Sequence, residues 1–267
     1  MIRKFLAKVN LLPSKPKYFV PNPADSDIYL VSYPKSGNTW MRYLLAYSIW
    51  PDLPEIDLAQ MGELIPSCGI QHDFKKMHNP HSPCNHLKHR VIKQHFNYNT
   101  ETAKRYAKRV IYVVRDGRDA IVSYWHYCNQ RDGTNISFST FIESSSRHGR
   151  GPWKKHVLGW LHAPVREKLI IRYEDMLDCP ESCLETALDF VEITAARDVI
   201  KDAVRRASFN SLKGLEQQKG FNLEELKNIE FIRKGKKGSW QDTFGPGDIK
   251  RFNEYHGGPI PELGYIW

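Results

Sequence analysis

The stretch YPKSGNTW (residues 33–40) lies between an apolar run, DIYLVS (residues 27–32), and a segment whose apolar residues recur at helical spacing (residues 41–49). This order predicts a strand, a loop and a helix. A loop that enters a helix presents free backbone N–H groups, and the helix dipole adds partial positive charge at the same place. The stretch is therefore predicted to bind an anion of the phosphate type.

The residue types of this loop suit an anion but do not follow the usual order. Lys35 brings a full positive charge, and the hydroxyl groups of Ser36 and Thr39 bring further donors. In the Walker pattern the lysine follows the last glycine and the next residue holds Mg²⁺, whereas here the lysine precedes Gly37. The run VVRD (residues 113–116) comes close to a magnesium-binding strand without matching it. These departures favour a metal-free anion site over a nucleoside triphosphatase site, although such a turn can also do no more than cap a helix.

Apolar runs and helical patterns alternate along the rest of the chain. Strands are expected at residues 27–32, 90–93, 110–114 and 168–172, and helices after residue 116, over 152–162 and over 181–190. This alternation predicts an α/β fold with a central parallel sheet flanked by helices, in which ligands bind at the carboxyl ends of the strands. No linker divides the chain, so we expect one domain over residues 1–267, with an N-terminal extension (1–26) and a C-terminal tail (235–267) that wraps the surface.

The composition is that of a globular protein with a basic surface. Of the 267 residues, 41% are hydrophobic, which is enough for one substantial core. The formal net charge of +9 favours an anionic partner such as a nucleotide, a nucleic acid, an acidic glycan or a membrane surface. No apolar run approaches the roughly 18 residues of a membrane span, and the first residues lack the apolar stretch of a secretory signal. The five cysteines are scattered, which suits reduced thiols, so the expected location is the cytoplasm.

Two segments have more than one interpretation. In residues 1–12, apolar side chains recur at helical spacing between basic ones, which predicts a short helix that either docks on the domain or makes weak contact with an anionic membrane surface. Residues 78–89 (HNPHSPCNHLKH) contain four histidines and one cysteine, a density that can bind zinc. Because the spacing matches no standard ligand set, a loop over the active site is favoured and no metal site is predicted.

Several motifs in order resemble those of one family. YPKSGNTW resembles the 5′-phosphosulfate loop of the cytosolic-type sulfotransferases, which use 3′-phosphoadenosine 5′-phosphosulfate (PAPS). VIYVVRDGRDAIVSYWHY (110–127) is similar to that family's 3′-phosphate segment, IRYEDM (171–176) and ASF (207–209) to its adenine-contacting stretches, and FIRKGKKGSWQDTF (231–244) to its C-terminal segment. GPWKKHVLGWL (151–161) also resembles a segment of the family, but the resemblance assigns it no role. The similarity spans about residues 28 to 244.

The resemblance implies a role for each matching residue. Lys35, Ser36, Gly37, Asn38 and Thr39 would hold the 5′-phosphosulfate, Arg115, Ser123, Arg233, Lys234 and Gly235 the 3′-phosphate, and Trp40, Tyr173 and Phe209 the adenine. Taken singly, these residues have plainer explanations: Arg115 could only pair with Asp119, RKGKK could be a solvated charge run or a nucleic-acid patch, and the aromatic residues could belong to the core. Together they supply the cationic groups and flat apolar faces that a doubly anionic nucleotide needs.

Transfer of a sulfuryl group to a hydroxyl also requires a base, and 11 histidines are candidates. VIKQH (91–95) resembles the family's base segment, which usually has threonine where this chain has Gln94. It points to His95, at the end of a predicted strand, as the catalytic base, with Lys93 assisting. Lys35 would stabilise the charge that builds on the leaving oxygen.

The chain also departs from the family's pattern at two places. Asn38 stands where the loop often has threonine, and residues 241–250 do not reproduce the short dimerisation motif of many animal members. The first change is expected to be mild because backbone N–H groups do most of the holding. From the second, that dimer is not predicted.

Two functions fit these observations. The first is a PAPS-dependent sulfotransferase that acts, without a metal and without a nucleic-acid partner, on the hydroxyl group of a small alcohol, a phenol or a carbohydrate. The second is a nucleotide-binding or nucleic-acid-binding protein on the same fold that has no transferase activity. Lys35 and His95 discriminate between them, because a protein that only binds requires neither.

Overall fold

Four parallel strands form the centre of the molecule. A computed structural model describes residues 23–68, 79–147, 150–219 and 229–267. The strands are β1 (Ile28–Ser32), β2 (Val91–Gln94), β3 (Arg109–Val114) and β4 (Glu167–Arg172), and they are arranged in the order β2-β1-β3-β4. Ile28 is paired with Val91 on one side and Arg109 on the other. The predicted strands are thus confirmed to within one residue at each end.

Alternate residues of each strand face opposite sides of the sheet and build two hydrophobic cores. In β1, Ile28 and Leu30 pack with the helices on one face, while Tyr29 and Val31 pack with those on the other. All four side chains are completely buried. This is the expected environment for a central strand of a parallel sheet that is covered on both faces.

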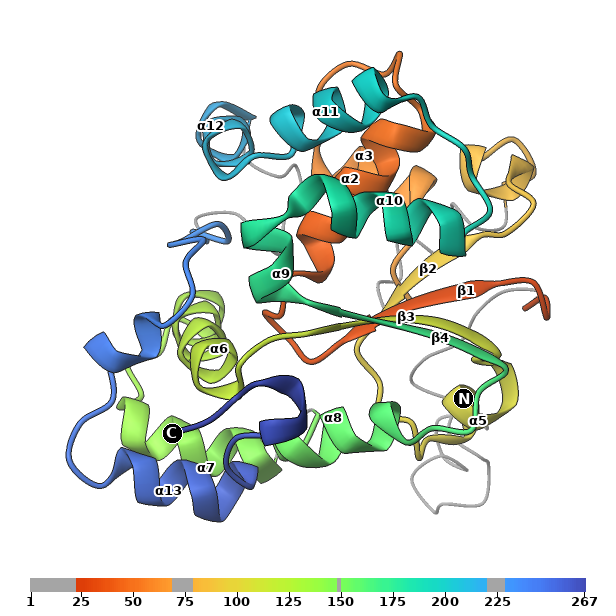
Figure 1. Cartoon of the computed structure of the whole chain (residues 1–267). Helices are drawn as coiled ribbons and strands as arrows, with labels where there is room; N and C mark the ends of the chain where they lie inside the picture. Colours follow the sequence, from red (N-terminus) through yellow and green to blue (C-terminus); the bar gives the residue numbers. More distant parts are fainter. Residues whose placement is uncertain (1–22, 69–78, 148–149, 220–228) are drawn as a thin grey trace, which may run out of the picture.

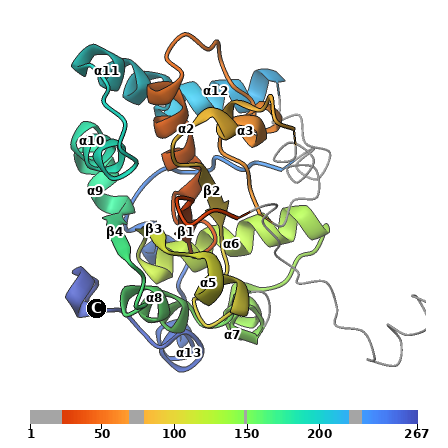
Figure 2. The same ribbon diagram turned by 90° about the vertical axis from the view of Figure 1, so that its right-hand side faces the viewer.

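Helices cover both faces of the sheet, as Figure 1 shows, and the view turned by 90° keeps the same two groups (Figure 2). One group comprises α2 (Asn38–Ile49), α3 (Leu58–Leu64), α10 (Pro180–Phe190), α11 (Arg197–Arg206) and α12 (Phe209–Lys219). The other comprises α5 (Glu101–Tyr106), α6 (Gly117–Asp132), α7 (Phe138–Arg147), α8 (Trp153–Leu161) and α13 (Asp248–His256). The helix α9 (Tyr173–Asp178) follows β4, and η1 (Pro83–His86), η3 (Ser239–Asp242) and η4 (Pro261–Leu263) are short 3₁₀ turns. The predicted single-domain α/β fold is confirmed.

The C-terminal tail differs from the expectation that it only wraps the surface. It contains α13, which packs against α7 and α8. Phe252 and His256 of this helix are completely buried, and Tyr265 is nearly so. The tail is therefore part of the second core, because its apolar residues recur at helical spacing within a segment whose glycines and prolines mark only the turns.

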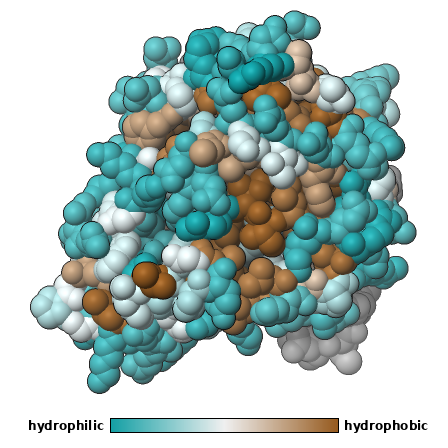
Figure 3. Space-filling view, in the orientation of Figure 1, coloured by the Kyte–Doolittle hydropathy of each residue, from teal (hydrophilic) through white to brown (hydrophobic). Residues whose placement is uncertain are grey.

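Strand β4 lies at the edge of the sheet, and five of its six residues are only partly buried. In the orientation of Figure 1, the middle of the molecular face near β4 is hydrophobic and is surrounded by hydrophilic residues (Figure 3).

Among the described residues, no helix combines the length and the apolar character needed to cross a bilayer. Residues 1–12, for which a helix was predicted, lie outside the described part of the chain.

Candidate nucleotide and proton-transfer site

The four strands end at the same edge of the sheet, and each is followed directly by a predicted site residue. The loop of residues 33–37 follows β1, His95 follows β2, Arg115 follows β3, and Tyr173 begins α9 after β4. Because parallel strands bring their carboxyl ends together, residues far apart in the sequence meet at this edge. The predicted loop, base and nucleotide segments are therefore brought to one place.

The opening loop has an unusual backbone conformation just before α2. Gly37 precedes α2 in the left-handed region, with φ 96°. Lys35 also has a positive φ, 64°, which is uncommon for a residue with a side chain. The hydroxyl of Ser36 is buried and has no hydrogen-bond partner among the described residues. A buried, unpaired donor beside the free N–H groups of a helix start fits a bound oxyanion.

One wall of this loop is aromatic. A β-carbon added to Gly37 would lie 2.6 Å from the ring of Tyr173, so this position has room only for glycine. The ring of Trp40 meets that of Tyr173 edge to face, with the centroids 5.8 Å apart. Two of the three rings predicted to contact adenine therefore lie together beside the anion loop.

Asn38 uses its side chain in a way that the sequence did not indicate. Its amide nitrogen donates to the carbonyl of Leu30 at 3.1 Å, to the hydroxyl of Ser32 at 3.3 Å and to the carbonyl of Gln94 at 3.4 Å. These bonds tie the end of β1 to the end of β2. The amide nitrogen of Asn38 is therefore engaged with the sheet, and nucleotide binding by this residue, expected mainly through its backbone N–H, stays a prediction.

Lys35, Arg115 and Arg233 form a cationic cluster above the loop. The Lys35 ammonium donates to the carbonyl of Phe231 at 3.2 Å and lies 3.5 Å from the centre of that ring. Burial, followed by the charge of Arg115, lowers the pKa of Lys35 to about 7. Burial and Arg115 likewise lower the pKa of Arg233. Such an excess of positive charge favours an anionic ligand at this place.

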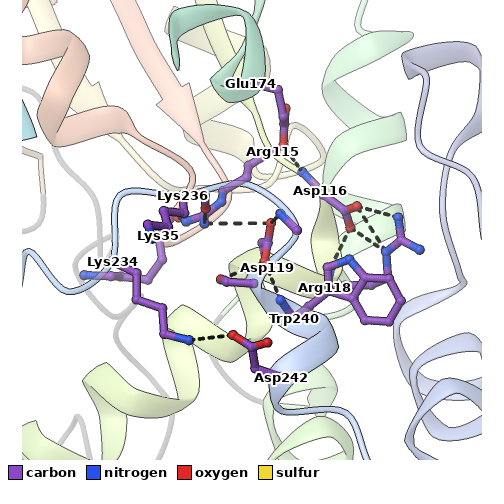
Figure 4. Close-up of polar contacts among 12 residues, drawn as sticks. Lys35, Arg115, Asp116, Arg118, Asp119, Glu174, Lys234, Lys236, Trp240 and Asp242 are labelled. Atoms are coloured by element: carbon purple, nitrogen blue, oxygen red, sulfur yellow. Dashed lines mark hydrogen bonds and ion pairs between the residues drawn. The ribbon is translucent and has the colours of Figure 1, made fainter. Parts of the chain in front are cut away.

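Arg115 connects the opening loop to the C-terminal segment, as Figure 4 shows. Its guanidinium donates to the carbonyl of Lys35 at 3.1 Å and to that of Lys236 at 2.9 Å. It also lies over the ring of Tyr173, 4.3 Å from the centroid. Arg115 thus contacts three of the predicted nucleotide segments.

Asp119 holds the C-terminal segment and is more than a partner for Arg115. Its carboxylate is 4.0 Å from the Arg115 guanidinium, whereas it accepts hydrogen bonds from the backbone N–H groups of Gly238 at 2.7 Å and Trp240 at 2.8 Å. The hydroxyl of Ser239 donates to it at 3.1 Å. This role was not predicted, because no local pattern connects Asp119 to residues more than a hundred positions further along the chain.

Residues 231–238 contain no helix or strand, and side chains hold them in place. Besides Asp119 at their end, Glu216 of α12 accepts from the backbone N–H groups of Phe231 at 2.5 Å and Ile232 at 3.2 Å. An isolated acid in a helix offers no local signal, so Glu216 was also missed. The predicted residues Gly235 and Phe209 are in close contact: a β-carbon added to Gly235 would lie 2.3 Å from the Phe209 ring.

A cavity of about 500 Å³ opens beside this segment. Its lining includes Phe209, Arg233 and Lys234, three of the predicted nucleotide residues. Lys234 forms an ion pair with Asp242 at 3.0 Å (Figure 4). Ser123, the remaining predicted 3′-phosphate residue, lies in α6 and is partly buried.

A second polar network connects the segments that follow β3 and β4 to the C-terminal residues, and Figure 4 shows part of it. Glu174, next to Tyr173, accepts from the backbone N–H of Asp116 at 3.1 Å and from the Tyr265 hydroxyl at 2.8 Å. Asp116 pairs with Arg118, whose guanidinium lies over the Trp240 ring, 4.3 Å from the centroid. The ends of β3 and β4 are thereby linked to η3.

His95 stands beside the opening loop with its ring orientation fixed. Its Nδ1 atom lies 2.8 Å from the carbonyl oxygen of Ser32. The Ser32 hydroxyl is more distant from Nδ1, at 3.3 Å. Because the shorter contact is to a carbonyl, which can only accept, we assign the proton to Nδ1 and the lone pair of the neutral ring to Nε2. Burial, followed by the charges of Lys93 and Arg150, lowers the pKa of His95 well below its usual value. The ring is therefore neutral near pH 7.

His89, the last residue of the histidine-rich segment, contacts other parts of the fold. His89 has Nδ1 3.1 Å from the carbonyl of Ser26 and Nε2 3.1 Å from a carboxylate oxygen of Glu192. Within residues 79–89 and the rest of the described chain, no three His, Cys, Asp or Glu side chains come together as metal ligands would. His78, the first residue of the segment, is outside the described residues.

Known proteins resemble this chain over most of its length. Residues 25–260 match the family described as "Sulfotransferase domain". Flavonol 3-sulfotransferase of Flaveria bidentis is 28% identical over 239 residues, covering 82% of this chain and 77% of that protein. Sulfotransferase 1 family member D1 of Rattus norvegicus is 26% identical over 255 residues, covering 85% and 81%.

Solved structures share the fold at lower identity. Mouse sulfotransferase SULT7A1, crystallised with PAP, has a TM-score of 0.61 and 24% identity over 86% of this chain and 82% of that chain. Retinol dehydratase, in complex with retinol and PAP, has a TM-score of 0.64 and 22% identity over 89% and 81%. The sheet whose strand ends carry the opening loop, His95 and Arg115 thus has the fold of these solved structures. The chain belongs to the sulfotransferase family and is a PAPS-dependent enzyme of the cytosolic type.

Proposed function

We propose that this sulfotransferase transfers the sulfuryl group of PAPS to the hydroxyl group of a small alcohol, a phenol or a carbohydrate, with His95 as the general base. When bound, the donor supplies an activated sulfuryl group whose leaving group is the 5′-phosphate. The acceptor oxygen would form the new bond to sulfur as the bond from sulfur to the phosphate oxygen breaks. The acceptor proton would pass to Nε2 of His95.

The hydrogen bond between His95 and Ser32 carries this proposal. It leaves Nε2 as the one ring nitrogen with a lone pair, at the strand edge where the opening loop also begins. The lowered pKa keeps the ring unprotonated before the reaction. It also makes His95 a weak base, so proton transfer is expected to accompany sulfuryl transfer rather than to precede it.

The cationic groups would stabilise the charge that develops during transfer. Lys35, in the loop, would move from the Phe231 carbonyl toward the leaving oxygen, where its charge counts most in the transition state. Arg115 and Arg233 would hold the 3′-phosphate. Besides burial, the charge of Arg115 lowers the pKa values of both Lys35 and Arg233, and a bound anion would offset this repulsion between positive charges. Ser36 has an unpaired hydroxyl for the 5′-phosphate.

The acceptor is proposed to be a hydroxyl-bearing small molecule or glycan. One relative is named for a flavonol, and one structural neighbour was crystallised with retinol; both are small molecules with hydroxyl groups. The charges of Lys93 and Arg150, which act on His95, would favour an oxygen that gains negative charge as its proton leaves. Lys93 would in this way assist the base.

Substitution of His95 tests the proposal. His95→Ala should lower kcat for transfer from labelled PAPS by about 10²–10⁴-fold, the usual contribution of a general base. Binding of 3′-phosphoadenosine 5′-phosphate (PAP), measured by calorimetry, should change little because His95 is not among the residues proposed to hold the nucleotide. His162→Ala, an exposed histidine at the end of α8, is the matched control. Full activity in His95→Ala would reject His95 as the base.

A further inference from the structure

The motif GPWKKHVLGWL (151–161), most of which forms α8, has no role among the proposed nucleotide and proton-transfer residues. Two of its side chains reach the segment that bears His95. The Nε2 atom of His156 lies 3.3 Å from the carbonyl oxygen of His95. The indole N–H of Trp160 donates to the carbonyl oxygen of Phe96 at 2.8 Å. Residues one helical turn apart thus bond to two consecutive carbonyls.

The direction of these bonds follows from their chemistry. A carbonyl can only accept, so His156 must carry its proton on Nε2 and donate it to the His95 oxygen. Burial lowers the pKa of His156 to about 3, which keeps its ring neutral. Its Nδ1 atom then accepts from the Tyr112 hydroxyl at 2.9 Å. His156, Trp160 and Tyr112 are all fully or almost fully buried, so the arrangement is rigid.

These bonds act where the sheet stops. The pairing of β2 with β1 ends at Gln94 and Val31, so no strand ladder holds His95 or Phe96. The Ser32 carbonyl fixes the orientation of the His95 ring. The position of the ring also depends on the backbone of His95, which lies beyond the last paired residue of β2. Because α8 holds the two carbonyls that follow the ladder, the backbone beneath the ring is held as well.

We propose that His156 and Trp160 are positioning residues that hold the backbone of the catalytic base, so that the Nε2 atom of His95 faces the acceptor. This inference rests on the proposed function, in which His95 is the base. It assigns a task to the motif of α8, namely to continue the support of β2 past its last strand residue. The two residues act through His95 and are not themselves expected to touch substrate.

Two tryptophans on the same helix give a matched pair of variants. Trp160→Phe keeps a buried aromatic ring of smaller volume and removes the N–H that donates to Phe96. Trp153→Phe makes the same change at an equally buried position, where the indole N–H has no partner among the described residues. We expect Trp160→Phe to lower kcat by up to about 10²-fold through misplacement of the base, with the KM for PAPS unchanged. Trp153→Phe should retain kcat.

A conservative exchange at His156 provides a rescue. His156→Gln keeps an amide N–H near the position of Nε2 and should retain most of kcat, whereas His156→Leu leaves the His95 carbonyl unpaired and should lose it. Thermal unfolding of both variants shows whether a loss of activity follows from a loss of folded protein. Equal loss of kcat in the two variants at equal stability would overturn the positioning role of His156.

A double-mutant cycle separates this inference from the proposed function. If Trp160 acts through His95, Trp160→Phe should have no further effect on the residual activity of His95→Ala. An undiminished effect in that background, or equal losses of kcat in Trp160→Phe and Trp153→Phe, would overturn the positioning role alone. Full activity of His95→Ala would instead remove the base assignment, and the positioning role with it.

Discussion

The opening loop and the C-terminal segment are proposed to bind the same nucleotide, yet they are built in opposite ways. Residues 33–40 are fixed mainly by their own neighbours in the sequence, because β1 ends just before them and α2 begins within them, and Arg115 adds one bond to the Lys35 carbonyl. Residues 231–238 have neither a strand nor a helix, and their backbone is held by Glu216, Arg115 and, at the far end, Asp119. One half of the site is therefore local and rigid, and the other depends on side chains from distant elements.

This difference has a physical consequence. A loop between a buried strand and a helix can move only if the core moves with it, so its geometry is as stable as the domain. A segment tethered by a few hydrogen bonds can open locally without global unfolding. We expect substitutions in the two regions to affect different quantities: the stability of the whole protein in one case and donor binding in the other.

The largest contrast is expected between two glycines, one in each region. Gly37→Ala introduces a left-handed alanine, at roughly 1–2 kcal/mol, and a clash with the buried Tyr173 ring, at roughly 1–3 kcal/mol. Gly235→Ala brings similar backbone strain, but Phe209 is 38% exposed and can move away. Urea unfolding should therefore show a clearly larger loss for Gly37→Ala. Equal losses would contradict the local, rigid character of the opening loop.

The tethered region is best tested at Asp119. Asp119→Ala removes three hydrogen bonds to residues 238–240. Bonds to a charged group are worth about 1.5–3 kcal/mol, so PAP should bind roughly 10–10²-fold more weakly, measured by calorimetry. Asp132→Ala, at the exposed end of the same helix, is the control and should bind PAP normally. Unchanged affinity in Asp119→Ala would mean that the segment is held without this carboxylate.

The smallest expected effect is a pH dependence that joins the two regions at Lys35. Its pKa is lowered to about 7, first by burial and then by Arg115, and a bound anion would favour its charged form. Below that pH Lys35 is charged and should add no pH dependence to PAP binding; as the pH rises above it, binding should weaken, by at most about tenfold per pH unit. Calorimetry of wild type and Lys35→Arg from about pH 6 to about pH 9 separates this effect from titration of PAP itself. Identical profiles would exclude Lys35 as the titrating group.

The sequence predicted the part of the site that is local. The four strands, the loop before α2 and the position of His95 after β2 follow from periodicity and from turn residues, which act over a few residues. The tethers could not be predicted in this way. Asp119 and Trp240 are 121 residues apart, and the sequence suggested for Asp119 only a pairing with Arg115, four residues before it. Glu216, His156 and Trp160 likewise bond to backbone groups that no local pattern connects to them.

By itself, the sequence determined the α/β class, the positions of the strands and the family, because hydrophobic periodicity and ordered motifs are properties of short segments. Only the tertiary structure decided which way the side chain of Asn38 points, which nitrogen of His95 carries the proton and how the C-terminal segment is held. Each of these depends on a hydrogen bond between a side chain and a distant backbone group. Such bonds form only after the sheet has brought the strand ends together.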